Sequence, residues 1–115
     1  MAIKTGREIK RVVKEYTKLL LKAGLPIEKI ILFGSYALRK ANDNSDIDLA
    51  VVLKELKEDR FTTRLKLMKY CRNFNEVIEP HPFLNSEFDD TNPFAFEILK
   101  NGIILYSYST KYNNS

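Results

Sequence analysis

The chain has 115 residues, of which 44% are hydrophobic and 30% are charged. This length suits one compact domain and leaves too few residues for a second core, and the composition is too apolar for a disordered protein. The net charge of +4 and the isoelectric point near 9.2 favour anionic partners. The single cysteine, Cys71, excludes an internal disulfide framework and gives no sign of a cysteine-based zinc site.

No targeting or membrane segment is predicted. The amino terminus lacks the apolar core of a signal peptide, and no window approaches the roughly eighteen apolar residues of a membrane span. A reducing cytoplasm is therefore the expected location, and no membrane partner is expected.

The first predicted element is a helix over residues 6–23. Thr5 and Glu8 have the spacing of a capping box, and Gly24 followed by Pro26 ends the helix. One apolar stripe, opposite a face rich in Lys and Arg, recurs at helical spacing and consists of Ile9, Val12, Val13, Tyr16, Leu19, Leu20 and Ala23.

Two strands are predicted on either side of a polar connection. Residues 29–33 form a short apolar run that ends at Gly34, which predicts a buried strand entering a tight turn. Residues 35–40 are expected to make about one helical turn, and residues 41–45 a loop. Residues 47–53 are apolar and partly β-branched, so they predict the second strand.

A helix and a third strand are predicted next. Residues 59–72 place their apolar side chains roughly on one helical side, with basic residues between them. Residues 77–81 predict a strand. Pro80 and the following Pro82 favour the end of that strand or the edge of the sheet, because proline cannot donate to a ladder.

A last helix and strand complete the domain. Asn92 caps the helix, Pro93 takes its first position, and Gly102 stops it after residue 101. Residues 103–106 predict a final short strand.

The predicted fold class is α+β, with a small mixed sheet packed against helices, because helices and strands alternate with connections of varied length. The domain is expected to span residues 1–106. Residues 107–115 are polar and aperiodic, which predicts a flexible tail.

Two aspartates at the start of the second predicted strand are candidate metal ligands. Because side chains alternate along a strand, Asp46 and Asp48 project to one face and Ile47 and Leu49 to the other. Two carboxylates held close together repel, so they need solvent or a cation between them. Magnesium is the natural candidate, since it takes oxygen ligands and completes its shell with water and substrate phosphates.

A glycine and a serine end the preceding strand. Gly34 has no Cβ, which permits a tight turn and lets a phosphate approach the backbone closely. Ser35 supplies a hydroxyl and a plausible N-cap for the following turn, whose free amide groups favour an anion. Phosphates and metal are therefore expected to meet at neighbouring strand ends.

The combined motif resembles the signature of the minimal nucleotidyltransferases of the DNA polymerase beta superfamily. Gly34 and Ser35 are followed by residues 36–45 and then by Asp46-Ile47-Asp48, and the surrounding Phe-Gly-Ser-Tyr-Ala and Ser-Asp-Ile-Asp-Leu-Ala-Val-Val also match. The resemblance implies a polymerase-beta-like fold. It also implies an enzyme that uses Mg²⁺ to transfer a nucleoside monophosphate, AMP from ATP, to a hydroxyl acceptor.

The resemblance also implies a third carboxylate from a later strand. Glu79 is the candidate, either as a ligand of the metal or as the group that deprotonates the acceptor hydroxyl. An acid in an apolar strand is unusual unless its face opens into a site, although an ordinary charge on an edge strand remains the alternative. His81, between two prolines, is interpreted as an exposed loop residue and is left out of the site.

The chain departs from the family pattern in one place. Many relatives carry a basic residue and then a glycine after Gly-Ser-x-Ala, whereas this chain has Leu38 and Arg39. Arg39 or Lys40 is therefore expected to take over the phosphate contact. The nucleotide-binding residues expected in full are Gly34, Ser35, Ser45 and Arg39.

Relatives of this size work beside a HEPN-domain partner, and some act as antitoxins that adenylylate a tyrosine of that toxin. The resemblance therefore implies a HEPN-type partner. Two alternatives stay open: a non-catalytic antitoxin or regulatory module on the same fold, and, less favoured, a nucleic-acid-binding protein. Lys66, Lys69 and Arg72 are candidates for a partner surface, and the oligomeric state stays open, a homo-oligomer included.

Overall fold

The computed structural model describes residues 6–42, 45–74 and 78–108. Its elements in chain order are α1 (Gly6–Lys22), β1 (Ile27–Phe33), β2 (Ile47–Leu53), α2 (Arg60–Cys71), β3 (Ile78–Leu84), the 3-10 helix η1 (Asn85–Glu87), α3 (Pro93–Asn101) and β4 (Ile103–Ser107). None of the helices in these three ranges has both the length and the apolar character needed to cross a lipid bilayer.

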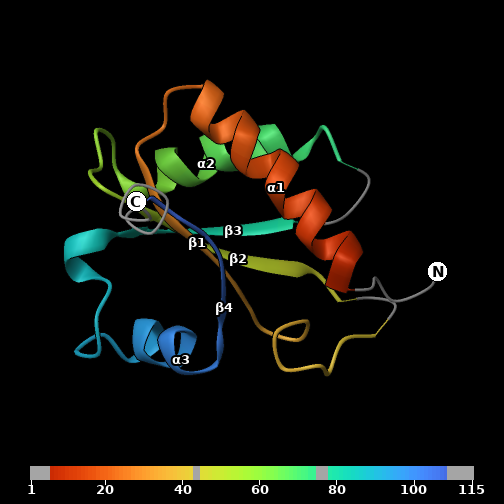
Figure 1. Cartoon of the computed structure of the whole chain (residues 1–115). Helices are drawn as coiled ribbons and strands as arrows, with labels where there is room; N and C mark the ends of the chain where they lie inside the picture. The colour runs from red at the N-terminus through yellow and green to blue at the C-terminus, as the bar shows by residue number, and fades with distance from the viewer. Residues whose placement is uncertain (1–5, 43–44, 75–77, 109–115) are drawn as a thin grey trace, which may run out of the picture.

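The four strands form one mixed sheet in the order β3-β2-β1-β4 (Figure 1). β1 pairs antiparallel with both β2 and β4, whereas β2 and β3 run parallel. A parallel pair needs a crossover connection, and α2 supplies it between β2 and β3. The mixed sheet beside packed helices confirms the predicted α+β fold class.

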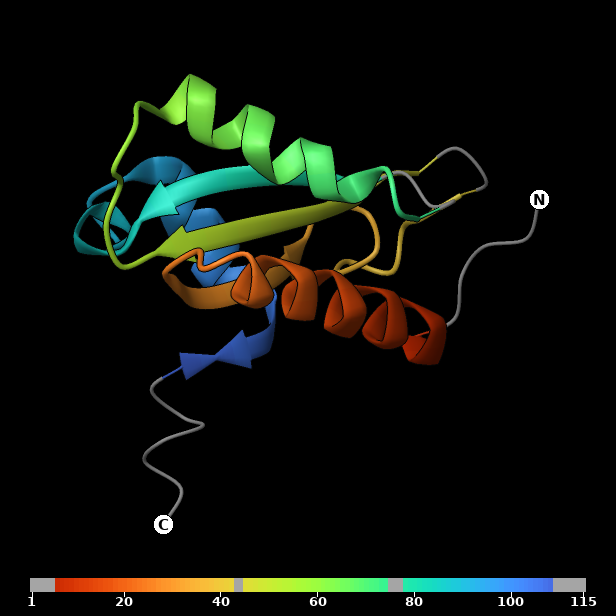
Figure 2. The same ribbon diagram turned by 90° about the horizontal axis from the view of Figure 1, so that it is seen from above.

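Helices cover both faces of the sheet. α1 and α2 lie over one face and α3 over the other (Figures 1 and 2). β2 supplies both cores, since Ile47 and Leu49 join the cluster under α1 and α2 whereas Ala50 and Val52 join the cluster under α3. A strand buried on both faces reads as a continuous apolar run, as residues 49–53 do.

The helix predicted over residues 6–23 is confirmed as α1, which ends one residue earlier, at Lys22. Most of its apolar stripe is buried, but Leu19 is half-buried and Ala23 is exposed. Tyr16 lies at its centre without exposed surface, and its hydroxyl donates a hydrogen bond of 2.8 Å to the Leu67 carbonyl of α2. Burial, with Cys71 beside it, raises the pKa of Tyr16 far above its usual range. The predicted capping residue Thr5 lies outside the described residues.

The caps of the other two helices use the short polar side chains that precede them. Asp59 accepts a hydrogen bond of 2.7 Å from the Thr62 amide, which lowers the pKa of Asp59. Asn92 accepts hydrogen bonds from the amides of Phe94 and Ala95 at 3.0 and 3.2 Å. The predicted start of the last helix is thereby confirmed.

The single helical turn predicted at residues 35–40 is present, but it is not continued into a helix. The Leu38 amide donates to the Gly34 carbonyl at 3.1 Å, which is the four-residue spacing of an α-helix. The Lys40 amide then donates to the Ser35 carbonyl at 2.8 Å, a spacing of five residues that ends the helical pattern. Arg39 explains the change, because its φ of 59° is left-handed. A non-glycine residue in that conformation ends a right-handed turn.

The strand predicted at residues 77–81 is longer than expected. β3 continues through both prolines to Leu84, while Val77 lies outside the described residues. β3 is at the edge of the sheet, as the prolines predicted, but they do not end it. Pro80 and Pro82 are two residues apart, so the amide hydrogens that they lack would both point to the same side of the strand. Because β3 pairs continuously with β2, that side is the outer edge of the sheet.

The carboxyl-terminal boundary shifts by one residue from the prediction. Ser107 belongs to β4 and pairs with Lys29 of β1. Residues 109–115 lie outside the described residues, so the predicted tail stays a prediction.

Replacing Arg39 by glycine is expected to stabilise the fold. Glycine adopts left-handed φ without a steric penalty, so Arg39→Gly should raise the free energy of unfolding by up to about 1 kcal/mol. Lys40→Gly is the control, because Lys40, next to Arg39, has no left-handed φ. This variant should be less stable than the wild type, since glycine gains backbone freedom in the unfolded chain. Urea denaturation of the two variants measures the difference, and equal destabilisation by both would contradict the prediction.

Candidate active site

The register of the sheet places Asp48 between two neighbours. It lies opposite Phe33 at the end of β1 and opposite Glu79 near the start of β3. Asp48 is half-buried, whereas the flanking Ile47 and Leu49 are buried under α1, which confirms the predicted alternation at Asp48. Asp46 is half-buried and immediately precedes β2, so its place on the same face stays a prediction.

Gly34 packs directly against Asp48. Its φ is 74°, and a Cβ at this position would collide with the Asp48 carboxylate and lie 3.2 Å from Cγ. Glycine was expected here for the approach of a phosphate. The structure adds a second requirement, since only glycine leaves room for the carboxylate and accepts the left-handed turn.

Glu79 is held by a cation from the neighbouring helix. Its Oε2 lies 3.2 Å from Nη2 of Arg64 of α2, and both side chains are partly exposed. The sequence offered two interpretations of Glu79, a metal ligand or a charge on an edge strand. The ion pair joins it to α2 and does not exclude either.

The three predicted carboxylates are not assembled as a metal centre. In the described ranges, no group of three His, Cys, Asp or Glu side chains is arranged to hold a metal ion. Asp46 and Asp48 nevertheless fit the needs of magnesium, which binds through one or two carboxylates and takes its other ligands from water and phosphates. The metal roles of Asp46, Asp48 and Glu79 therefore stay predictions.

His81 belongs to this site, although the sequence interpretation left it out as a loop residue. It lies within β3, and its Nε2 is 3.5 Å from Oδ1 of Asp48. The imidazole makes edge contacts with Phe33 and Phe94, at 5.2 and 6.1 Å between ring centres. The alternation of β3, with Glu79 and His81 two residues apart, was the signal that would have found it.

The remaining predicted residues surround the connection between β1 and β2. Ser45 closes the loop, since its Oγ accepts a hydrogen bond of 2.8 Å from the Asn42 amide and its own amide donates to the Asn42 carbonyl. Ser35 is half-buried directly after Gly34. Arg39 is exposed and lines a cavity together with Tyr36. The nucleotide contacts expected of Ser35, Ser45 and Arg39 stay predictions.

The effect of a methyl group at Gly34 tests the contact with Asp48. Gly34→Ala should lower the free energy of unfolding by about 2 kcal/mol or more, since it adds a collision to the left-handed strain. Gly24→Ala is the matched control: Gly24 has a φ of 84°, but nothing lies within 4 Å of an added Cβ.

A double-mutant cycle, measured by urea denaturation, isolates that collision. Asp48→Ala removes the carboxylate and leaves only its Cβ, 3.3 Å from the added methyl group, so most of the difference between the penalties of Gly34→Ala and Gly24→Ala should disappear. An unchanged penalty for Gly34→Ala in the Asp48→Ala background would show that the collision is not its cause.

Comparisons with known proteins identify the family of the chain. The family model described as "Polymerase beta, Nucleotidyltransferase" matches residues 8–111. A Methanocaldococcus jannaschii protein named "Putative protein adenylyltransferase MJ1379" is 37% identical over 68 residues, which cover 59% of this chain and 67% of the relative.

Two solved structures share the fold. The first is "a putative nucleotidyltransferase from Sulfolobus solfataricus", with 20% identity, a TM-score of 0.64, and coverage of 88% of this chain and 82% of the other. The second is a complex of a tri-AMPylated Shewanella oneidensis HEPN toxin with an MNT antitoxin, with 18% identity, a TM-score of 0.54, and coverage of 91% and 78%. At such low identity these two likenesses concern the fold alone. The family match, by contrast, spans most of the chain, and the chain therefore belongs to the polymerase beta nucleotidyltransferase family.

Proposed function

We propose that the protein is a Mg²⁺-dependent adenylyltransferase that transfers AMP from ATP to a hydroxyl group of a partner protein and releases pyrophosphate. The observation that carries this proposal is the contact of Gly34 with Asp48. It brings the turn proposed to bind phosphates against the carboxylate proposed to bind metal. The name of the Methanocaldococcus jannaschii relative supports the choice of AMP and of a protein acceptor.

The residues of this site would have two tasks, to bind the phosphates and magnesium and to position the groups that bind them. The backbone after Gly34 and the Ser35 hydroxyl would hold the β- and γ-phosphates. Asp46 and Asp48 would hold magnesium, which would offset the negative charge of the triphosphate. Gly34 lies against Asp48 on one side and His81 lies near it on the other, and these contacts support this role. Alignment and electrostatics therefore account for most of the proposed catalysis.

The transfer step exchanges one bond to phosphorus for another. The acceptor oxygen forms a bond to the α-phosphorus of ATP while the bond from that phosphorus to the pyrophosphate oxygen breaks. Glu79 would either accept the proton of the acceptor hydroxyl or complete the metal site. Its place opposite Asp48 in the sheet register supports either role.

We further propose that the acceptor is a tyrosine of a HEPN-domain partner. The structural likeness to an MNT antitoxin in complex with a tri-AMPylated HEPN toxin motivates this choice. A non-catalytic antitoxin or regulatory module is the second candidate. The Arg64–Glu79 ion pair favours it, because that pair engages the third carboxylate with a cation other than a metal ion.

The aspartates provide the first test of catalysis. The purified protein, a HEPN-domain partner and Mg²⁺ should label the partner when ATP carries a radioactive α-phosphate. Asp46→Asn combined with Asp48→Asn should lower the rate by about a hundredfold or more, since the charge compensation at the phosphates is lost. Glu55→Gln, an exposed acid beyond the opposite end of β2, should leave the rate unchanged.

The outcomes separate the two candidate functions. Transfer that survives in the double aspartate variant would contradict the enzyme proposal. A wild-type protein that binds the partner but neither transfers AMP nor binds ATP with Mg²⁺ would support the non-catalytic module.

Glu79→Gln tests the third carboxylate. The variant should lower the rate of transfer at least about tenfold, because an amide neither accepts a proton nor offers a charged ligand. Glu87→Gln is the matched control, since Glu87 forms the neighbouring ion pair with Arg60 of α2 and lies outside the site. The rate of AMP transfer is measured for both variants with the same labelled ATP. An equal loss of rate in both variants would show that Glu79 takes no part in the reaction.

A further inference from the structure

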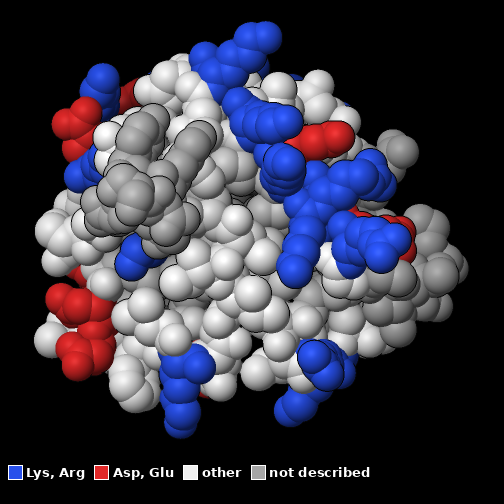
Figure 3. Space-filling model, in the orientation of Figure 1, with Lys and Arg blue, Asp and Glu red and all other residues white. Residues whose placement is uncertain are grey.

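The outer surface of α1 carries an excess of positive charge. Figure 3 shows Lys and Arg gathered along this helix, beside an uncharged surface. The exposed charged residues of α1 are six cations, Arg7, Lys10, Arg11, Lys14, Lys18 and Lys22, and two acids, Glu8 and Glu15. The partner surface expected from Lys66, Lys69 and Arg72 has a weaker basis, since Lys66 already forms an ion pair with Glu58.

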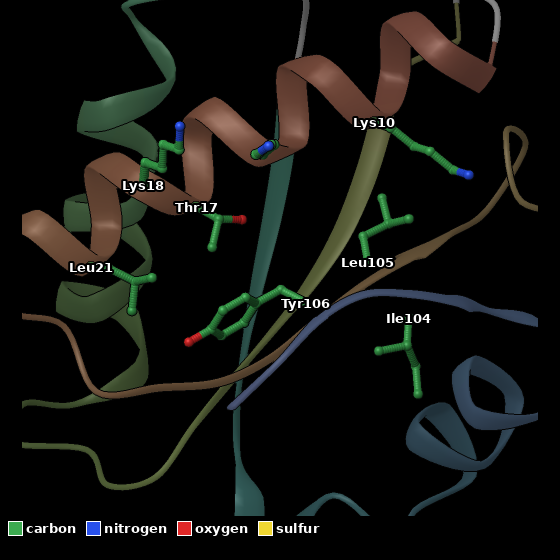
Figure 4. Close-up of a pocket in the computed structure, with 8 residues that line it drawn as sticks. Lys10, Thr17, Lys18, Leu21, Ile104, Leu105 and Tyr106 are labelled. Carbon is green, nitrogen blue, oxygen red and sulfur yellow. The ribbon is translucent and has the colours of Figure 1, made fainter. Parts of the chain in front are cut away.

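A groove separates α1 from the edge strand β4. Its volume is about 530 Å³, and Lys10, Lys14 and Lys18 line it from the helix. Figure 4 shows Lys10 and Lys18 projecting from α1, and Tyr106 lying in the space between the helix and β4. The groove therefore has a cationic wall on its helical side.

The strand side of the groove is apolar. Leu105 and Tyr106 line it from β4, and Ile103, which pairs with Leu32 of the cluster under α1, exposes 44% of its surface on the same face. Ile104 pairs with Ile31 of the cluster under α3, so its side chain projects from the other face of the strand. Leu21 adds an exposed apolar side chain at the carboxyl-terminal end of α1. A groove with exposed aliphatic side chains and polar residues around them marks a surface that contacts other proteins.

The groove continues towards the candidate active site. A second cavity of about 630 Å³ shares Lys10 and Leu105 with the first, and it reaches Tyr36 and Arg39. These two residues belong to the turn that follows Gly34. The two cavities form one surface that leads from Leu21 to this turn, and we call this surface the α1–β4 groove.

We propose that the α1–β4 groove docks an amphipathic segment of a partner protein, with acidic side chains on one side and apolar side chains on the other. The acidic side would face Lys10, Lys14 and Lys18, whose spacing of four residues aligns them along the helix. The apolar side would cover Leu21 and Ile103, which line the two cavities. The inference rests on the proposed function in one respect: the docked partner is the acceptor, held beside the turn after Gly34.

Charge and polarity distinguish this partner from two other occupants. A nucleic acid would match the lysines but would leave Leu21 and Ile103 uncovered, because its backbone is charged along its whole length. A second copy of this chain placed symmetrically would bring its own cationic α1 towards the first, and like charges oppose such a pairing. An acidic, amphipathic protein segment satisfies both walls of the groove.

The probe is a fluorescent helical peptide with Glu on one face and Leu on the other, measured by anisotropy at low salt. Lys10→Glu, Lys14→Glu and Lys18→Glu together should weaken its binding at least about tenfold. Arg7→Glu, Arg11→Glu and Lys22→Glu together change the net charge equally on the same helix and line neither cavity. This control should change the affinity by less than about threefold.

Further variants separate docking from general charge attraction. Ile103→Ser and a peptide with Ser in place of Leu should each weaken binding about fivefold or more, since both remove apolar contact. The three lysines replaced by glutamine should give a smaller loss than the glutamate variant. These substitutions all lie at exposed positions, so thermal unfolding should show that each variant folds.

Three results would overturn the proposal. The first is an equal loss of affinity in the groove variant and the control variant, and the second is equal binding of the Leu and Ser peptides. The third is displacement of the peptide by a thymidine 20-mer that binds the wild type more tightly than the peptide does and that does not bind the groove variant. This result would assign the groove to nucleic acid.

Two additional measurements distinguish this proposal from the proposed function. The groove variants should bind ATP with Mg²⁺ as the wild type does, and the Asp46→Asn, Asp48→Asn variant should bind the peptide as the wild type does. Peptide binding without any AMP transfer would contradict only the adenylyltransferase proposal. AMP transfer to a partner at an unchanged rate in the groove variant would contradict only the docking proposal.

Discussion

The pairing of β2 on both of its edges is the constraint on which the site depends. It sets Asp48 opposite Phe33 on one side and opposite Glu79 on the other. A slip of one residue would turn Asp48 into the core under α1 and bring a buried neighbour to the site. Because Ile47 and Leu49 are almost completely buried, hydrophobic packing opposes that slip. The apolar core therefore fixes the place of the charged group that the proposed chemistry uses.

Much of this arrangement follows from local signals in the sequence. The apolar stripe of α1, the cap at Asn92 and the alternation around Asp48 each depend on residues a few positions apart, so their outcome was predictable. The helical turn after Gly34 was predicted, but the way it ends was not. Leu38 and Lys40 donate to carbonyls four and five residues back, and a left-handed Arg39 between them has no clear signature in a single sequence.

The features that sequence reasoning missed come from contacts between separate elements. Arg64 and Glu79 lie on α2 and β3, and only the packing of that helix brings their charges within 3.2 Å. His81 was misplaced because two prolines suggested a loop, whereas an edge strand tolerates prolines whose missing donors face outwards. The contact of Gly34 with Asp48 was also invisible, since the glycine alone was explained by the turn. The motif identified the residues, and the tertiary structure supplied the relations between them.

The same prolines affect how the sheet can meet other chains. An exposed strand edge is a template for another strand, and open edges on both sides of a sheet allow chain after chain to add and form a fibre. Pro80 and Pro82 remove two donors from the outer side of β3, so an incoming strand cannot form a continuous ladder there. In the described part of the chain, β4 forms the opposite edge and carries no proline. Strand addition at β4 could join one further chain, but the β3 edge would stop the growth of a fibre.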